Sequence, residues 1–129
     1  MRLCSISEDK SGLYQVLYSL RPQIILAAQC IYDEWDQSGD DSGGGICDEI
    51  ASAIGDILAQ FDINHTYGGH EGDDHAYIIA YNDYESYVVD ITPETYEHGG
   101  GYSWTKIPDV QFELDDVIIA RVHRPDWIK

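Results

Sequence analysis

The sequence predicts an α+β domain in which helices come first and an antiparallel sheet follows. Apolar residues recur every three or four positions up to Phe61, which is the spacing of one buried helix face. After Phe61 they follow the two-residue period of strands. Strands that follow one another without intervening helices favour antiparallel pairing. The chain has 129 residues, of which 43% are apolar, and this suits a single compact domain over residues 1–129.

Two helices are predicted at the start of the chain. An apolar stripe from Leu13 to Leu20 follows Ser11, a residue type that caps helices. A second stripe ends at Trp35 and begins near Pro22, because proline suits the first turn of a helix. Pro22 could instead kink one long helix.

The segment from Asp36 to Gly45 has no apolar residue and four glycines, which indicates a loop. A third helix then begins abruptly at Ile46-Cys47, and its apolar residues keep helical spacing up to Phe61. Asp48 and Glu49 fall in its first turn, where the helix dipole favours acidic residues.

Four strands are predicted after this helix. The segment Ala76 to Ala80 is apolar on both faces, so its strand should be central in the sheet and covered. Glycine-rich loops are expected from Gly68 to Asp74 and from Pro93 to Trp104. The predicted strands are Phe61 to Tyr67, His75 to Tyr81, Tyr87 to Thr92 and, approximately, Val117 to Val122.

The charge of the chain is strongly unbalanced. Twenty-four acidic residues against seven lysines and arginines give a formal net charge of −17, and no lysine or arginine occurs between Arg21 and Lys106. A nucleic acid or an anionic membrane would meet a repulsive field, so we exclude both as partners. A cationic peptide or protein fits this charge better. A solubility or high-salt adaptation would produce the same composition.

The three cysteines, Cys4, Cys30 and Cys47, are an odd number without a C-x-x-C spacing. Neither a disulfide framework nor a thiolate zinc site is therefore expected. No apolar run approaches the roughly 18 residues of a membrane span, and the residues after Met1 do not resemble a signal peptide. We expect a cytoplasmic protein.

Cys47 stands where the glycine-rich loop meets the third helix. Its sulfur would there face unpaired N–H groups and the positive end of the helix dipole, and both favour the thiolate. Asp48 and Glu49 oppose this effect, so a nearby proton acceptor would be required. The alternative is a buried small apolar residue, because Cys47 shares a helix face with Ile50 and Ile54.

His75 begins a predicted strand whose hairpin partner contains Asp90 as its one charged residue. A two-residue turn at Asn82-Asp83 would pair the two residues directly, and a four-residue loop at 82–85 would leave them diagonal on the same face. In either register the carboxylate could orient the imidazole. The alternative for Asp90 is a strand-end aspartate that caps the turn towards Pro93.

Gly45-Ile46-Cys47-Asp48-Glu49-Ile50-Ala51, His75-Ala76-Tyr77 and Asp90-Ile91-Thr92 occur in this order, with Asp90 fifteen positions after His75. Together they resemble the motifs of the transglutaminase-like superfamily, a branch of the papain-like cysteine enzymes. Tyr77 and Ile91 stand where the family usually has Trp and Pro. The resemblance implies a papain-like core, with the nucleophile helix packed on the antiparallel sheet. It also implies roles for Cys47 as nucleophile, His75 as general base and acid, and Asp90 as the orienting group.

A papain-like site also needs donors to the oxyanion and residues that contact the substrate. The backbone N–H of Cys47 would be one donor, and Gln29 and Gln37 are candidates for the second. The residues from Gly99 to Ser103 could act as a lid. The residues expected to bind substrate are Gly45, Tyr77 and Trp104.

A metal site is a competing interpretation of the histidines and acids that surround the second strand. Imidazoles and carboxylates together can hold zinc or another divalent ion, but their five-residue spacing matches no metal motif. This set consists of His65, His70, His75, Glu71, Asp73 and Asp74. His98 and His123 have no visible partner and are expected at the surface.

The function expected from the sequence is a cysteine hydrolase that cleaves a peptide or side-chain amide through a thioester, without a cofactor or metal. Its substrate would be a peptide or protein, with a cationic one favoured by the charge. The alternative is a non-catalytic module of the same fold, whose acidic groove holds a basic protein partner. The oligomeric state is left open.

Overall fold

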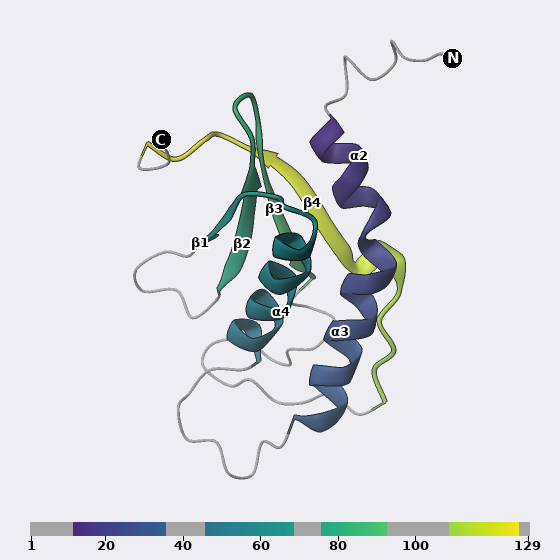
Figure 1. Cartoon of the computed structure of the whole chain (residues 1–129). Helices are drawn as coiled ribbons and strands as arrows, with labels where there is room; N and C mark the ends of the chain where they lie inside the picture. The colour runs from purple at the N-terminus through teal and green to yellow at the C-terminus, as the bar shows by residue number, and fades with distance from the viewer. Residues whose placement is uncertain (1–11, 36–45, 69–75, 93–108, 127–129) are drawn as a thin grey trace, which may run out of the picture.

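The computed structural model describes residues 12–35, 46–68, 76–92 and 109–126. Within these ranges three α-helices lie on one side of a four-stranded antiparallel sheet, which confirms the α+β class (Figure 1). The strands follow the order β1-β2-β3-β4, so each strand lies beside its neighbours in sequence. None of the described helices is long and apolar enough to cross a membrane. The elements are α2 (Gly12–Ser19), α3 (Arg21–Glu34), α4 (Cys47–Gln60), β1 (His65–Gly68), β2 (Tyr77–Tyr81), β3 (Ser86–Ile91), the 3-10 helix η3 (Leu114–Asp116) and β4 (Val117–Val122).

Leu20 separates the first two helices. Its N–H donates to the carbonyls of Val16 and Leu17 at 3.1 and 3.0 Å, and its own carbonyl accepts from the N–H of Ile24 at 3.0 Å. Pro22 lies in the first turn of α3, where its missing N–H needs no helical partner. Pro22 therefore belongs to the start of a second helix, rather than to a kink within one long helix.

The structure at the end of α4 shows that the first strand was predicted to begin too early. Asp62 adopts a left-handed conformation with φ of 59°. Its N–H donates to the carbonyl of Ala59 at 3.1 Å, and the N–H of Ile63 donates to that of Leu58 at 3.0 Å, which is a Schellman cap. The residues from Phe61 to Asp62 thus close the helix. The prediction of a strand from Phe61 was wrong at its start, because β1 begins only at His65.

The other strands lie close to their predicted positions. β4 matches its prediction, and β3 begins and ends one residue earlier than expected. β2 lies between β1 and β3, with Ile78, Ile79 and Ala80 buried, so the expectation of a central, covered strand is confirmed. The predicted start of this strand, His75, and the predicted loops at 36–45, 69–74 and 93–104 lie outside the described residues.

The β2–β3 hairpin has the longer of the two turns considered. Tyr81 pairs with Ser86, which leaves the four residues 82–85 as the loop. The side-chain oxygen of Asn82 accepts the N–H groups of Tyr84 and Glu85 at 2.8 and 2.9 Å, and the Asn82 N–H donates to the Glu85 carbonyl at 3.0 Å. Asparagine thus closes the turn with its own side chain. The alternative prediction, a two-residue turn at Asn82-Asp83, was therefore wrong.

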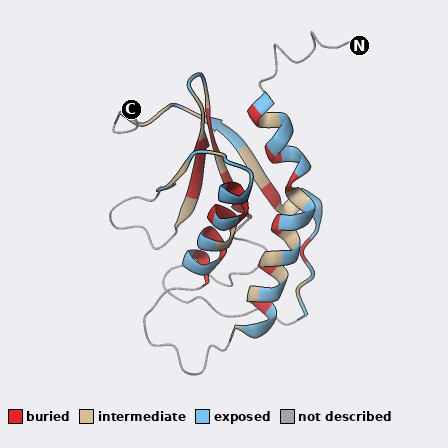
Figure 2. Cartoon of the chain, viewed as in Figure 1, coloured by how far each residue is buried: buried red, intermediate tan, exposed pale blue. Residues whose placement is uncertain are grey.

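The hydrophobic core lies between the three helices and one face of the sheet, here called the inner face (Figure 2). Strand residues alternate between this face and the opposite, outer face. Burial of each large aliphatic side chain in such a core contributes about 1.5–3 kcal/mol. The sheet residues in the core cluster, which define the inner face, are Ile78, Ala80, Tyr87, Val89, Ile91 and Val117.

Candidate active site

Cys47 is the first residue of α4 and is buried, with 5% of its surface exposed. Ile46 precedes it at the N-cap position and provides no side-chain hydrogen bond to the helix end. The first N–H groups of α4 therefore lack a side-chain cap from Ile46 and point towards the beginning of the helix. Asp48 and Glu49 follow on the exposed side of the same turn. The predicted start of the helix is confirmed, and its first residue is the candidate nucleophile.

Asp90 lies near the end of β3 and is also buried, with 4% exposure. It alternates with Val89 and Ile91, which are core residues of the inner face, so Asp90 belongs to the outer face. Its cross-strand partner on β4 is Ile118. One further step of the β2–β3 register places Tyr77 opposite Asp90. A charged residue is thus buried within an apolar strand, on the face away from the helices.

The start of α4, the start of β2 and the end of β3 lie at the same end of the molecule (Figure 1). Gly55 of α4 packs against β2, because a β-carbon there would lie 3.6 Å from Cδ1 of Ile78. Cys47 is eight residues before Gly55, or about 12 Å along the helix axis, on the side towards the start of β2. The structure thus brings Cys47, Tyr77 and Asp90 to one end of the two layers.

Three predicted site residues, Gly45, His75 and Trp104, lie outside the described residues. The hairpin register still decides between the two arrangements considered for the predicted His75–Asp90 pair. With a four-residue loop, a continuous β2 would leave these two positions diagonal rather than directly opposite.

Gln29 is not available as an oxyanion donor. Its side-chain amide donates to the carbonyl of Val110 and to Oδ1 of Asp33, both at 3.0 Å. Its side-chain oxygen accepts the N–H of Phe112 at 2.8 Å. One amide hydrogen and the side-chain oxygen therefore hold the segment before η3 against α3, and the other hydrogen is used within α3 by Asp33, so this candidate was wrong. Gln37, the other candidate, is outside the described ranges.

The proposed metal set is represented in the structure by His65 alone. Nδ1 of His65 lies 3.0 Å from the carbonyl oxygen of Ile63, and its ring packs beside Gly55. Among the residues that the structure describes, no three His, Cys, Asp or Glu side chains gather as metal ligands would. The rest of the set, from His70 to His75, is not described.

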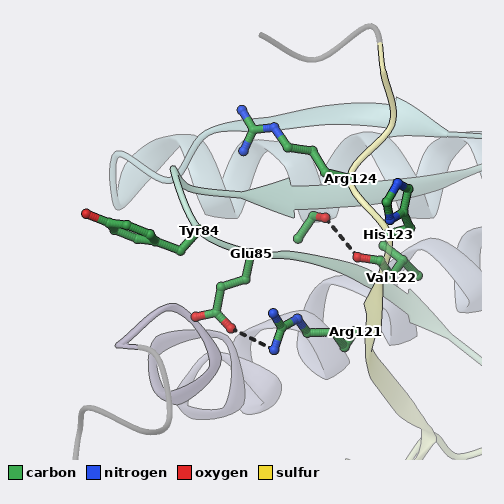
Figure 3. Close-up of a pocket in the computed structure, with 7 residues that line it drawn as sticks. Tyr84, Glu85, Arg121, Val122, His123 and Arg124 are labelled. Carbon is green, nitrogen blue, oxygen red and sulfur yellow. Dashed lines mark hydrogen bonds and ion pairs between the residues drawn. The ribbon is translucent and has the colours of Figure 1, made fainter.

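A pocket of about 430 Å³ lies at the other end of the sheet, between the β2–β3 hairpin and the end of β4 (Figure 3). This pocket was not predicted from the sequence. The sequence feature that could have indicated it is the cluster of three basic residues, Arg121, His123 and Arg124, within four positions of a strongly acidic chain. The lining residues are Tyr84, Glu85, Ser86, Arg121, Val122, His123 and Arg124.

Comparison with known proteins identifies no relative: no protein-family model matches the chain, and no curated protein or solved structure matches it significantly. The resemblance to the transglutaminase-like superfamily therefore rests on the three sequence motifs around Cys47, His75 and Asp90.

Proposed function

We propose that this protein is a cysteine hydrolase with a papain-like, transglutaminase-like core, and that it cleaves an amide bond of a peptide or of a side chain. The observation that carries the proposal is the common position of Cys47, Tyr77 and Asp90 at one end of the helix and sheet layers. These residues come from three elements and from all three motifs. Their shared position is what a composite active site requires.

In the proposed reaction, His75 takes the proton of the Cys47 thiol as the sulfur attacks the amide carbon. The carbon–nitrogen bond then breaks, and His75 returns the proton to the leaving amine. The acyl group remains on sulfur as a thioester. Water, deprotonated by His75, attacks the thioester, releases the acid and restores the thiol. The backbone N–H of Cys47 would donate to the oxyanion in both steps.

Asp90 acts on the imidazole in this proposal and not on the sulfur. Its position on the outer face separates it from α4, which packs on the inner face. A carboxylate so placed can orient a histidine at the start of β2 and stabilise its cation. Replacement of such a carboxylate by an amide leaves the imidazole in the wrong tautomer, so Asp90 should matter even without contacting the substrate.

The burial of Cys47 favours a second candidate, a non-catalytic module that binds a basic partner. A buried cysteine, with 5% exposure, that shares its helix face with the buried Ile50 is also what a structural cysteine would show. The exposed Asp48 and Glu49 would then contribute to an acidic binding surface. Such binding should weaken with salt and should not depend on Cys47.

Cysteine labelling separates the two candidates, because accessibility and activation predict opposite results. Cys30 is exposed on α3 and Cys47 is buried, so unactivated thiols would react in the order Cys30 before Cys47. An activated Cys47 should react first with iodoacetamide at pH 7. Labelling rates of both sites are measured by mass spectrometry on the native full chain.

Two variants complete this experiment. Cys47→Ala should remove the fast labelling and leave the folded spectrum unchanged, and Cys30→Ala should keep the fast labelling. His75→Ala should slow Cys47 to the rate of an ordinary buried thiol. If Cys30 reacts first in the native protein and His75→Ala changes nothing at Cys47, the hydrolase proposal is wrong.

A further inference from the structure

The described sheet has β1 and β4 at its edges, and β4 is the longer of the two edge strands (Figure 1). β1 has four residues, whereas β4 has six. An edge strand presents a row of backbone N–H and C=O groups to a further strand, and a short edge strand presents few of them. β4 is therefore the edge of the sheet that is better suited to pair with another chain.

The β3–β4 ladder determines which backbone groups of β4 point away from the sheet. The N–H of Thr92 donates to the carbonyl of Asp116 at 2.8 Å, and bonded pairs alternate with non-bonded pairs from there. In the continuous register, every second residue from Ile118 bonds to β3. The residues between them, Ile119 and Arg121, direct their N–H and C=O groups to the free edge. Within the described ranges no backbone hydrogen bond reaches these groups.

The outer face of β4 carries apolar side chains. Ala120 is exposed, and Ile118 and Val122 on either side of it are half-buried. Ile119 alternates with these residues and packs against the core on the inner face. Isoleucine and valine also favour extended backbone. A strand added beside β4 would thus extend the hydrogen-bonded ladder and this apolar face together.

Charges of opposite sign lie at the two ends of β4. Acidic residues precede the strand, and basic residues lie at its end. An antiparallel copy of the same strand would bring its basic end beside this acidic end, and two-fold symmetry would repeat the contact. A parallel copy would place like charges together. The acidic residues are Glu113, Asp115 and Asp116, and the basic ones are Arg121, His123 and Arg124.

We propose that two copies of this protein associate through their β4 strands, which pair antiparallel about a two-fold axis at Ala120. Ile119 of each copy then lies opposite Arg121 of the other, and each of these pairs exchanges two backbone hydrogen bonds. On the outer face, Ile118 of each copy lies opposite Val122 of the other. The two sheets become one continuous sheet. This proposal does not depend on the reactivity of Cys47.

The start of β4 favours this register over the neighbouring one. The N–H of Val117 already donates to the carbonyl of Leu114, which closes the 3-10 helix η3. A two-fold axis at Ile119 would place Val117 opposite Arg121 of the other copy, and that pair could form one of its two hydrogen bonds. An axis at Ala120 pairs Ile119 with Arg121, and both backbone groups of each residue are available in the described structure.

The formal net charge of −17 opposes association of two copies. Exposed charges that are separated by more than the Debye length, about 8 Å at physiological ionic strength, are largely screened. The guanidinium of Arg121 already contacts Oε1 of Glu85 at 3.4 Å, and its side chain is 65% exposed. It can keep this contact in solvent while its backbone pairs with the second copy. We therefore expect a dimer that dissociates on dilution.

Sedimentation equilibrium of the full chain tests the association itself. The measurement covers protein concentrations from about 10 to about 300 µM at physiological ionic strength, which detects a Kd of up to about 1 mM. A reversible equilibrium between monomer and dimer is expected. A chain that stays monomeric over the whole range would overturn the proposal.

Two substitutions of Arg121 test whether the backbone of β4 makes the contact. Arg121→Pro removes an N–H that points to the free edge, and proline is tolerated at such an edge position. It should weaken the dimer at least about tenfold, because each copy loses one donor. Arg121→Gln is the matched control, because it loses the same ion pair with Glu85 and keeps the N–H. It should weaken the dimer by about threefold at most. Equal effects of the two substitutions would contradict backbone pairing.

A cysteine at the two-fold axis tests the register and does not depend on proline being accommodated. In a chain with Cys4→Ala and Cys30→Ala, Ala120→Cys should form an intermolecular disulfide under mild oxidation. The α-carbons of a non-hydrogen-bonded antiparallel pair are about 4.5 Å apart, which a disulfide can span. Thr66→Cys, on the outer face of the opposite edge strand β1, is the control and should crosslink much more slowly.

The rate of crosslinking decides between β4 and another surface. Fast crosslinking of Ala120→Cys alone supports the proposed pairing. Equal rates for the two cysteine variants, or a dimer that Ala120→Cys fails to crosslink, would show that association does not use the β4 edge. The amide spectrum of each variant checks that its sheet is intact.

Discussion

The ring of Tyr77 lies over the α-carbon of its cross-strand partner, Gly68. The two residues are paired in the β1–β2 register. A β-carbon built on Gly68 would be 2.3 Å from Cε1 of Tyr77 and 2.9 Å from Cδ1 and Cζ, which is closer than real atoms approach. Gly68 is thus required for the present position of the Tyr77 ring, at the end of the sheet that carries Cys47 and Asp90.

The substitution Gly68→Ala should therefore displace the Tyr77 ring and destabilise the fold by about 1–3 kcal/mol, as overpacking does. Gly12→Ala is the matched control, because a β-carbon there meets nothing within 4 Å. That change in α2 should be neutral or stabilising by up to about 1 kcal/mol. Urea unfolding measures both. Equal effects of the two substitutions would contradict the contact between Gly68 and Tyr77.

Asp62 is a weak point at the end of α4. A non-glycine residue with φ of 59° is strained, and its negative charge lies at the negative end of the helix dipole. Asp62→Gly removes both costs and should stabilise the protein by about 1 kcal/mol. The thermal or urea midpoint of the full chain reports the change.

Asp62→Asn separates the two contributions to this effect. It removes the charge and keeps a side chain that tolerates the left-handed conformation, so it should give a smaller gain, about 0.3–1 kcal/mol at low salt. The gain of Asp62→Asn should shrink with added salt, and most of the gain of Asp62→Gly should remain. A loss of stability in Asp62→Gly would show that the Schellman cap is not formed.

The boundary between α4 and β1 shows what local sequence patterns can and cannot predict. Hydrophobic spacing located α4, because that helix buries one regular face, and the prediction for β4 also matched its observed bounds. The same pattern placed a strand at Phe61, since the residues from Phe61 to Tyr67 alternate in polarity. The cap at Asp62 depends on a positive φ of a non-glycine residue, which the composition of the segment does not indicate.

Some parts of the candidate site could likewise be predicted from neighbouring residues in the sequence, and other parts depend on residues far away in the sequence. The helix start at Cys47 could be predicted from the glycine-rich segment before it and from the apolar residues at helical spacing after it. The position of Asp90 relative to the start of β2 depends on the hairpin register, and the Asn82 side chain stabilises that register through two hydrogen bonds. The role of Gln29 could not be predicted, because its partners lie 81 and 83 positions away in sequence.

Gln29 should be important for stability and not for catalysis. Gln29→Ala leaves the carbonyl of Val110 and the N–H of Phe112 without their partner in a partly buried place, which should cost about 1–3 kcal/mol. Gln23→Ala, at an exposed position of the same helix, should change stability by less than about 0.5 kcal/mol. Urea unfolding compares the two. If Gln29→Ala abolished thiol reactivity while its stability stayed normal, an oxyanion role would have to be reconsidered.

Asp90→Asn tests whether the buried carboxylate acts on Cys47 through a histidine. The side chains have the same shape, so the variant should keep the sheet, and the free energy of unfolding checks this. If Asp90 orients His75, labelling of Cys47 should slow by at least about tenfold, because the amide favours the wrong tautomer of the imidazole. Labelling of Cys30 should stay constant, since that thiol is exposed on α3.

The matched control for this last variant is Ser86→Ala. Ser86 is buried on the same strand and the same face as Asp90, with 1% exposure, and its hydroxyl donates to the carbonyl of Val122 at 3.0 Å. Its loss should cost about 1 kcal/mol of stability without affecting Cys47. Equal slowing in both variants would mean that any weakening of β3 disturbs the thiol. Slowing confined to Asp90→Asn would show that the carboxylate itself affects the reactivity of Cys47, which is what the proposed imidazole requires.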